Sequence, residues 1–283
     1  MELSHSSANL LQTCTQKFYY YKTGVKPDKD SEEDMTALNI GSAVHYLLEK
    51  ALDNHKYNPK KVKDNLKFVK KEYNLGLNWP LVYAMVLKYI SYHKKLKVNL
   101  IALELPVQNN NIIGYIDVIE GNDHGWSIVD LKTTSYISIP DLIVKTRMDP
   151  QLHIYASFIE DLATGLELDI KRFQGCHYRV ISKPKLSQRV SETNSEYVRR
   201  LLPNIRVEDI FVEHSPKMIA EVLEKHFRLK RLGEDILSGK IQPMKNTTSC
   251  FNYFKPCPYI SQCLGGKTYT ETVNEYHLKH GKK

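Results

Sequence analysis

The spacing of apolar residues divides the chain into a helical first part, a strand-rich middle and a mixed remainder. Apolar positions recur at helical intervals over residues 4–21, 36–52, 59–73 and 80–95, which predicts four helices. Runs rich in Ile, Val, Leu and Tyr over residues 100–107, 112–120 and 127–132 predict three strands. Farther along we expect a helix over 151–162, a strand over 173–182, a helix over 195–202, a short strand over 207–213 and a long helix over 216–237.

This order predicts an α/β protein with a mixed central β-sheet flanked by helices. At 283 residues the chain is short enough to be a single domain, and we expect one domain over residues 1–283. Within it, the helices of residues 54–98 are expected to cap a groove. Residues 240–265 are expected to pack against the N-terminal helix, and the charged residues 26–34 predict a linker.

A turn-like segment, Gly-Asn-Asp-His-Gly at residues 121–125, separates two of the predicted strands and indicates a β-hairpin. If the turn is centred after residue 123, Asp117 lies opposite Asp130, and Lys132 shares the face of Asp130. A shift of one residue in register would separate the three. Like charges placed opposite each other destabilise a hairpin, and a divalent cation between them would remove that cost. The hairpin therefore predicts a metal site beside a lysine.

The segment after the hairpin predicts a helix that carries two more polar groups. Asp149 suits the N-cap position and Pro150 the first helical position. Gln151 and Tyr155 then lie one turn apart on one face of the helix. Taken alone, Tyr155 would count as a core residue.

The helix predicted over residues 36–52 carries Gly41, His45 and Glu49 at intervals of four. Gly41 lowers helix propensity, and a close packing contact one turn before His45 would explain it, although chance would also do so. A lone histidine is more often a core residue than a ligand. Glu49 fits an exposed position or a partner of His45, and Glu104, in the strand over 100–107, fits a solvent-facing position.

Together these motifs resemble the PD-(D/E)xK nuclease superfamily, and in particular its RecB-like exonuclease branch, which includes phage recombination exonucleases and CRISPR-adaptation nucleases. The resemblance rests on the glycine–histidine–glutamate helix, then Gly114-x-x-Asp117, Asp130-x-Lys132 and Gln151-x-x-x-Tyr155, in that order. It extends from Ser4 to Cys263. It implies a restriction-endonuclease-like core with a helical N-terminal cap and a C-terminal cysteine clip.

The resemblance also implies a role for each of these side chains. Mg²⁺ or Mn²⁺ would be bound by oxygen and imidazole ligands, which suit hard cations. Lys132 would orient or help deprotonate the attacking water, while Gln151 and Tyr155 would brace the lysine and contact DNA. The implied metal ligands are His45, Asp117, Asp130 and the backbone carbonyl of Leu131. Apart from the resemblance, Glu49 and Glu104 are candidates for supporting the metal from outside its ligands.

Cysteines are placed unevenly, with Cys14 near the start of the chain and Cys250, Cys257 and Cys263 near its end. In a cytosolic protein this spacing favours a metal site over disulfides. RecB-like nucleases with one early and three late cysteines bind a four-iron, four-sulfur (4Fe–4S) cluster. This chain resembles them, except that the usual Cys-x2-Cys is replaced by Cys250-x6-Cys257, which leaves zinc or no metal as alternatives. Cys176 fits a buried strand position.

Charge and composition agree with a nucleic-acid partner without demanding one. The net charge is +8 and the isoelectric point is about 9.0, which suits a polyanion such as DNA. No run of residues is apolar enough to span a membrane, and a cytoplasmic location is expected, in the host cytoplasm if the protein is viral.

The resemblance implies a metal-dependent DNA exonuclease acting in recombination, repair or viral genome processing. One alternative is an endonuclease or a CRISPR-adaptation-type trimming nuclease. Another, from a different class, is a non-catalytic DNA-binding module that kept the fold. A recombination or annealing protein is a further possible partner, and the oligomeric state is left open.

Overall fold

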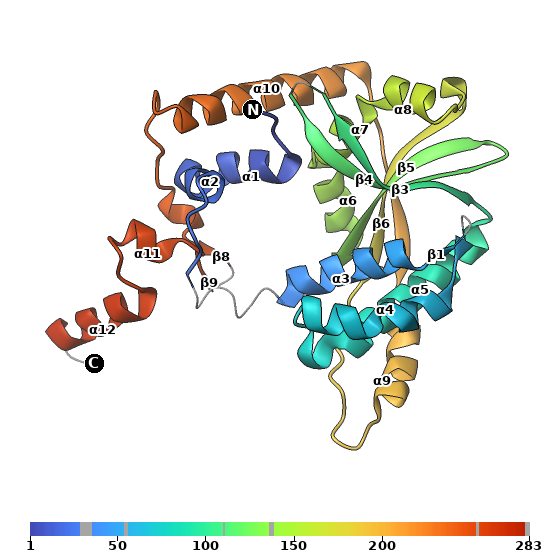
Figure 1. Cartoon of the computed structure of the whole chain (residues 1–283), viewed down its shortest axis with the longest axis horizontal. Coiled ribbons are helices and arrows are strands. Elements are labelled where there is room, and N and C mark those ends of the chain that lie inside the picture. Colours follow the sequence, from blue (N-terminus) through green and yellow to red (C-terminus); the bar gives the residue numbers. More distant parts are fainter. Residues whose placement is uncertain (29–35, 54–55, 110, 136–138, 253–254, 281–283) are drawn as a thin grey trace. The chain divides into compact units, whose positions relative to one another are not determined.

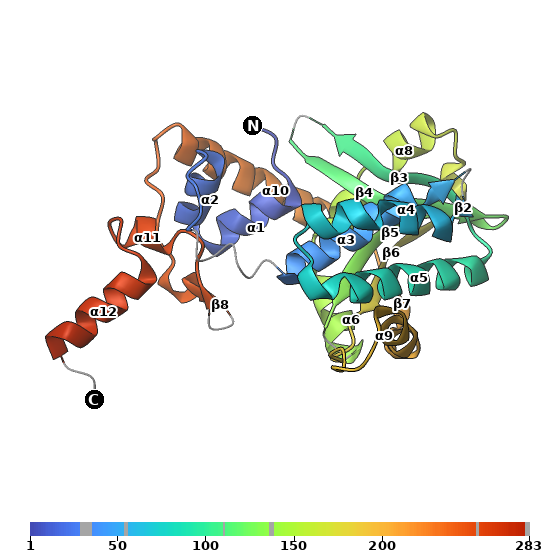
Figure 2. The same cartoon turned by 60° about the horizontal axis from the view of Figure 1, so that its bottom comes forward.

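A computed structural model of the chain describes residues 1–28, 36–53, 56–109, 111–135, 139–252 and 255–280. The chain divides into two compact units. Unit 1 consists of Met1–Met35, Asn109–Ile113 and Glu224–Lys283, and unit 2 consists of Thr36–Gln108 and Gly114–Leu223. Figure 1 labels most helices and strands of both, and β2 and β7 are labelled in Figure 2. None of the described helices is long and apolar enough to cross a membrane.

A five-stranded sheet with the order β3-β4-β5-β6-β7 forms the centre of unit 2. β4 pairs with β5 in antiparallel fashion, β5 with β6 in parallel, and β6 with β7 in antiparallel. The predicted mixed sheet is therefore confirmed, and each predicted strand matches an observed one to within about two residues. The strands are β3 (Asn99–Gln108), β4 (Ile113–Asn122), β5 (Gly125–Thr134), β6 (Phe173–Ser182) and β7 (Val207–Val212).

Helices α3 and α5 contact this sheet, α4 packs on α3 and α5, and α9 packs on α5; all four share one hydrophobic core with the sheet (Figure 2). Buried side chains at alternate strand positions, including Val129 and Leu131, face these helices. In α4 the side chain of Asn58 accepts a hydrogen bond from the N–H of Lys60, and Pro59 occupies the first turn. The bounds are α3 (Thr36–Lys50), α4 (Pro59–Glu72), α5 (Trp79–Leu96) and α9 (Asn194–Leu201).

Three further helices of unit 2 lie between β5 and β6 in the sequence: α6 (Ile139–Met148), α7 (Gln151–Ala156) and α8 (Ile159–Gly165). The single helix predicted over 151–162 is thus wrong in its length. Its break follows from Ser157, whose hydroxyl and N–H both donate to the carbonyl of Ile154, at 2.6 and 3.1 Å. This tightens the last turn of α7 and ends it. α6 was not predicted.

A buried ionic network lies on the same face of the sheet as Leu131. Arg179, which pairs with Leu131 in the β5–β6 ladder, donates two hydrogen bonds to Glu120, at 2.7 and 2.8 Å, and two to Asp209, at 2.7 and 3.2 Å. Burial alone would raise the pKa of Glu120, but the nearby His93 and the hydrogen bonds from Arg179 outweigh it and lower that pKa to about 2. These carboxylates are stabilised by a permanent cation within the core.

Unit 1 contains α1 (His5–Thr13), α2 (Thr15–Lys22) and most of α10 (Pro216–Leu237). Its core is formed by Leu3, Ala8, Leu11, Phe18 and Ile236. The single helix predicted over residues 4–21 is broken at Cys14, whose backbone is extended, with φ −164° and ψ 114°. The break lets the Thr15 hydroxyl and the Gln16 N–H both donate to the carbonyl of Met244, at 3.1 Å each.

The remaining described elements are short or peripheral. The predicted linker over residues 26–34 lies mostly outside the described residues, and the C-terminal helix α12 was not predicted. These elements are β1 (Leu52–Asp53), β2 (Lys56–Tyr57), β8 (Phe251–Asn252), β9 (Lys255–Pro256), α11 (Ile260–Cys263), α12 (Tyr269–His280) and the 3-10 turns η2 (Gly76–Asn78), η3 (Ile170–Arg172), η4 (Leu202–Asn204) and η5 (Thr247–Ser249).

Candidate metal and catalytic site

The hairpin has the register on which the predicted site depended. Its ladder pairs Asn122 with Gly125 and continues to Val118 opposite Val129, so the turn is centred after residue 123. The ladder ends at that last pair, one position before Asp117 and Asp130 would have paired. There the N–H of Leu131 donates to Asp117 Oδ2 at 2.7 Å, so a side chain accepts this hydrogen bond where the ladder no longer supplies a partner. β5 itself continues, paired with β6, as far as Thr134.

Helix α3 brings His45 to this point, and a glycine sets how closely the helix approaches. A Cβ added to Gly41 would lie 3.2 Å from Thr133 Oγ1 on β5, tighter than ordinary van der Waals contact. The close packing contact predicted one turn before His45 is therefore present. His45 Nε2 lies 3.1 Å from the carbonyl oxygen of Leu131, which turns Nδ1 toward the carboxylates.

Glu104 reaches the same point through an unusual backbone conformation. Its φ is 47°, in the left-handed region that non-glycine residues rarely adopt. Such a residue interrupts the regular alternation of side chains along β3. Glu104 does not simply face solvent as predicted: its side chain is 35% exposed, and its carboxylate lies near His45. The signal in the sequence was a carboxylate within an otherwise apolar run.

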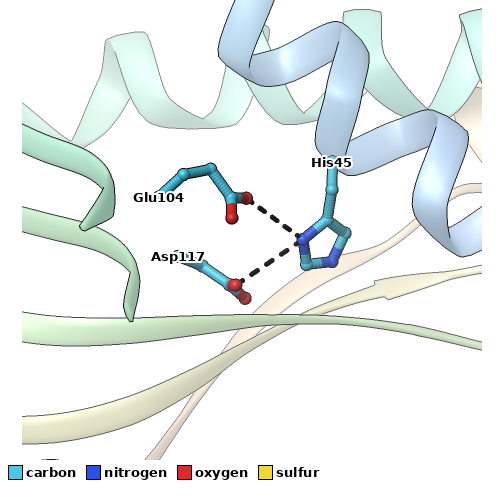
Figure 3. A group of neighbouring side chains, drawn as sticks. All are labelled: His45, Glu104 and Asp117. Carbon is cyan, nitrogen blue, oxygen red and sulfur yellow. Dashed lines mark ion pairs between the residues drawn. The ribbon is translucent and has the colours of Figure 1, made fainter. Parts of the chain in front are cut away.

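His45, Glu104 and Asp117 form a compact group of potential metal ligands (Figure 3). Nδ1 of His45 lies 3.7 Å from Glu104 Oε1 and 3.7 Å from Asp117 Oδ1. Among the described residues, this is the only group of three or more such side chains whose ligand atoms all lie within 4.8 Å of one another. Two carboxylates and an imidazole suit a hard divalent cation, so the residues fit Mg²⁺ or Mn²⁺.

Asp130 is held in a second, adjoining set of contacts. Its side chain is 1% exposed, and Lys132 Nζ lies 2.7 Å from its Oδ2. Nε2 of Gln151 donates to Asp130 Oδ1 at 2.8 Å, and Lys132 Nζ donates to Gln151 Oε1 at 2.8 Å. The predicted ligand Asp130 is thus paired with the lysine and lies outside the group of His45, Glu104 and Asp117.

Helix α7 supplies Gln151 and Tyr155 as the sequence predicted. Oδ1 of Asp149 accepts a hydrogen bond from the N–H of Gln151 at 2.9 Å, at the start of the helix. Nε2 of Gln151 donates to the hydroxyl of Tyr155 at 3.0 Å, and that hydroxyl donates to the carbonyl of Tyr115 at 2.6 Å. The two residues one turn apart therefore form a chain of hydrogen bonds that ends on β4.

Crowded carboxylates make the site electrostatically unusual. Burial and the nearby charge of Asp130 raise the pKa of Asp117 to about 7. Burial alone would lower the pKa of Lys132, but the adjacent Asp130 carboxylate outweighs it, and the net shift is upward. Lys132 is therefore a stable cation here. A bound metal cation would offset the negative charge of Asp117. Without one, the raised pKa means that a proton does so instead.

Glu49 and the cysteines, to which the sequence also pointed, are not part of the group of His45, Glu104 and Asp117. Glu49 lies 2.5 Å from Lys50 Nζ and is outside the group of His45, Glu104 and Asp117. All five cysteines are free thiols, with Cys176 buried as predicted. Within the described ranges, no three cysteine sulfurs lie within 4.8 Å of one another, as the ligands of a single zinc ion would, and the structure does not show the predicted iron–sulfur or zinc centre of Cys14, Cys250, Cys257 and Cys263.

Comparison with known families agrees with the fold. The sequence matches the model of the PD-(D/E)XK nuclease superfamily over residues 2–264, and the chain belongs to this superfamily. None of the curated proteins matches it.

Among solved structures, a "Putative exonuclease" from Eubacterium rectale is similar, with a TM-score of 0.54, 14% identity, and coverage of 99% of this chain and 94% of that one. At this identity the likeness shows a shared fold. A second structure, SSO0001, has 15% identity and covers 83% of this chain and 98% of that one. Its TM-score of 0.30 is too low to indicate a shared fold.

The raised pKa of Asp117 predicts that Asp117→Asn stabilises the metal-free protein at neutral and alkaline pH. Because the folded-state pKa of about 7 exceeds the unfolded value of about 3.9, the wild type loses stability as pH rises from about 4 to 7. The neutral amide can still accept the hydrogen bond from Leu131. We expect the variant to gain roughly 1–3 kcal/mol at pH 8 and almost nothing at pH 4, at 1.36 kcal/mol per pKa unit, as measured by denaturant unfolding in EDTA.

Asp64→Asn, on the exposed side of α4, is the matched control and should leave the pH dependence unchanged. Adding Mn²⁺ should raise the stability of the wild type but not that of Asp117→Asn, because binding to the folded state alone stabilises it. A variant that is less stable than the wild type at pH 8, or that still responds to Mn²⁺, would contradict this account of the site.

Proposed function

We propose that this protein is a Mg²⁺- or Mn²⁺-dependent deoxyribonuclease, most specifically an exonuclease, that hydrolyses phosphodiester bonds. One observation carries the proposal: in a chain of a nuclease superfamily, His45, Glu104 and Asp117 form a compact acidic group directly beside the paired Asp130 and Lys132. We assign the metal to His45, Glu104 and Asp117, with Asp130 and the carbonyl of Leu131 next to it.

When bound, the metal would acidify a water ligand and offset the charge that develops on the phosphate. The protein's own groups prepare the rest of the reaction. Lys132 stays protonated and is fixed by Asp130 and Gln151, so it acts as a positioned cation that orients the water and offsets charge on the scissile phosphate. Tyr155, through Gln151, keeps that assembly in place.

The choice of DNA and of exonuclease activity rests on charge, motifs and a structural likeness. The net charge of +8 favours a polyanion, the motifs resemble the RecB-like exonucleases, and a solved structure of the same fold is named as a putative exonuclease. Recombination, repair or viral genome processing are the processes we propose. An endonuclease, or a trimming nuclease of the CRISPR-adaptation type, would use the same centre.

The centre predicts which variants lose cleavage. Asp130→Ala and Lys132→Ala should each lower the cleavage rate by about 10²–10⁴-fold, because removing a positioned electrostatic group from an active site has effects of this size, while DNA binding is largely kept. Single-turnover cleavage of a labelled oligonucleotide with Mn²⁺ measures the rate. Lys217→Ala, at an exposed position on α10, is the control. Cleavage at the wild-type rate by either variant would refute the assignment.

Exonuclease and endonuclease activity differ in whether a strand end is needed. We expect the wild type to degrade linear DNA but not closed circular DNA, and to be slowed when both ends are blocked. Gel analysis of the three substrates, with strands labelled at the 5′ or the 3′ end, measures this. Cleavage of the closed circle would favour the endonuclease. DNA binding without cleavage in either metal would favour the non-catalytic module.

We propose separately, from the resemblance and the cysteine spacing, that unit 1 binds a 4Fe–4S cluster, with zinc as the alternative. One contact supports the proposal: Asn246 accepts a hydrogen bond from Cys250 Sγ through its carbonyl at 3.6 Å and donates its N–H to Cys14 Sγ at 3.4 Å. Asn246 thus connects the early cysteine with the late ones, although the sulfurs would have to move closer to surround a single ion.

Metal analysis after anaerobic purification tests the cysteine proposal. A bound cluster predicts about four iron atoms per chain and broad visible absorption, both lost in Cys14→Ser and kept in Cys176→Ala, the cysteine outside the set. Zinc bound in place of iron, lost in the same variant, would establish the alternative. A wild-type protein with neither metal would refute both.

A further inference from the structure

A cavity of about 250 Å³ lies at the far end of the sheet face that carries Lys132. The sheet contributes Thr134, Val180 and Ser182 to its lining, and the segment after β6 contributes Lys183 and Leu186. All of these residues belong to unit 2. None of them was among the residues that the sequence motifs pointed to.

The register of β5 and β6 connects this cavity to the catalytic centre. Asp130 pairs with Tyr178, Lys132 with Val180, and Thr134 with Ser182. Because alternate residues of a strand share a face, these pairs form one continuous surface. The position of Lys132 Nζ, 5.4 Å from the centre of the Tyr178 ring, shows that the lysine lies over that surface. The ladder partner of Lys132, Val180, is itself part of the cavity wall.

The lining combines cations with an apolar wall. Lys183, Lys185 and Arg206 are its basic residues, and Glu208 is its one acidic residue. Lys183 is partly buried, and within the described part of the chain no hydrogen bond or ion pair is found for its ammonium group. Burial lowers the pKa of Lys183. An ammonium group desolvated in this way, without a carboxylate partner, favours the binding of an anion.

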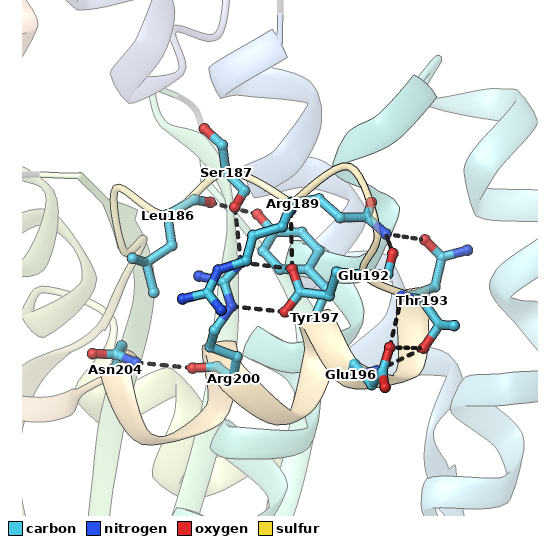
Figure 4. A network of polar contacts seen from close by, with 11 residues as sticks. Leu186, Ser187, Arg189, Glu192, Thr193, Glu196, Tyr197, Arg200 and Asn204 are labelled. Atoms are coloured by element: carbon cyan, nitrogen blue, oxygen red, sulfur yellow. Dashed lines mark hydrogen bonds and ion pairs between the residues drawn. The ribbon is translucent and has the colours of Figure 1, made fainter.

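The segment that carries Lys183 and Leu186 is fixed by a network on α9 (Figure 4). The hydroxyl of Tyr197 donates to the carbonyl of Leu186. Arg200 donates to the carbonyl of Ser187 at 2.8 Å and to Glu192 at 2.7 Å. On the other side, the N–H of Lys183 donates to the carbonyl of Thr134 at 2.6 Å. The cavity is therefore held at both edges by hydrogen bonds.

The size of the cavity limits its occupant. It is smaller than the roughly 300–1,000 Å³ of sites that enclose a whole small-molecule ligand, which suits one unit of a polymer whose remainder lies outside. An anionic group beside an apolar face, a short distance from a scissile phosphate, is the chemistry of a nucleotide.

We propose that this cavity binds the nucleotide next to the scissile phosphate of a single nucleic-acid strand, with Lys183 contacting its phosphate and the wall of Val180 and Leu186 contacting its base or sugar. The proposal rests on the nuclease function proposed above. It makes Lys183 a substrate-positioning residue: the nucleotide held there aligns the strand over Lys132.

Binding of a fluorescent single-stranded oligonucleotide without divalent metal tests the subsite. Lys183→Ala should weaken binding about five- to tenfold and reduce the slope of log affinity against log salt by about 0.7, the contribution of one phosphate contact on a single strand. Lys183→Arg should keep the slope, and the exposed Lys217→Ala should keep both. A deoxynucleoside 5′-monophosphate should compete for the wild type but not for Lys183→Ala.

Unchanged affinity and slope in Lys183→Ala, or an equal loss in Lys217→Ala, would overturn the subsite. Cleavage then separates this result from the fate of the proposed function. If the wild type cleaves DNA and Lys183→Ala has the same KM, only the subsite is wrong. If the wild type never cleaves but the binding differences are found, the proposed function fails and the nucleotide site stands.

Discussion

The site depends on the point at which the β4–β5 ladder ends. Up to Val118 and Val129 the two strands pair regularly, and beyond it β5 continues with β6 while the N–H of Leu131 binds the Asp117 carboxylate. This single hydrogen bond places a carboxylate at the opening between strands and fixes the carbonyl of Leu131 toward His45. His45 on α3, Glu104 on β3 and Gln151 on α7 lie around that opening.

Two acidic residues of the same strand have pKa values shifted in opposite directions. Glu120, beside Arg179, has a pKa of about 2, whereas Asp117, three residues earlier on β4, has one of about 7. The difference follows from the partner. Arg179 is a permanent cation that satisfies two carboxylates within the core, whereas Asp117 has the titratable His45 and two further carboxylates, Asp130 and Glu104, near it. The first arrangement stabilises the fold, and the second is the one to which we assign an exchangeable ion under the proposed function.

Much of this site could be predicted from the sequence, because the relevant signals are local. The turn residues fixed the register of Asp117 and Asp130, and Asp149 with Pro150 marked the start of α7. Glu104 could not be placed, since strand periodicity assumes regular alternation and its left-handed φ breaks it. The break at Cys14 and the cavity beside Lys183 depend on segments far apart in the chain, for which no local pattern gives a signal.

The absence of a methyl group at Gly41 also bears on which ion the site accepts. A Cβ there would push against Thr133, and relief of that contact would move α3, and with it His45, outward by a few tenths of an ångström. That distance is comparable to the difference between the metal–oxygen distances of Mg²⁺, about 2.0–2.1 Å, and Ca²⁺, about 2.3–2.6 Å. Under the proposed function, the ion selectivity of the centre would therefore be set in part by helix packing, at a residue that binds no ion.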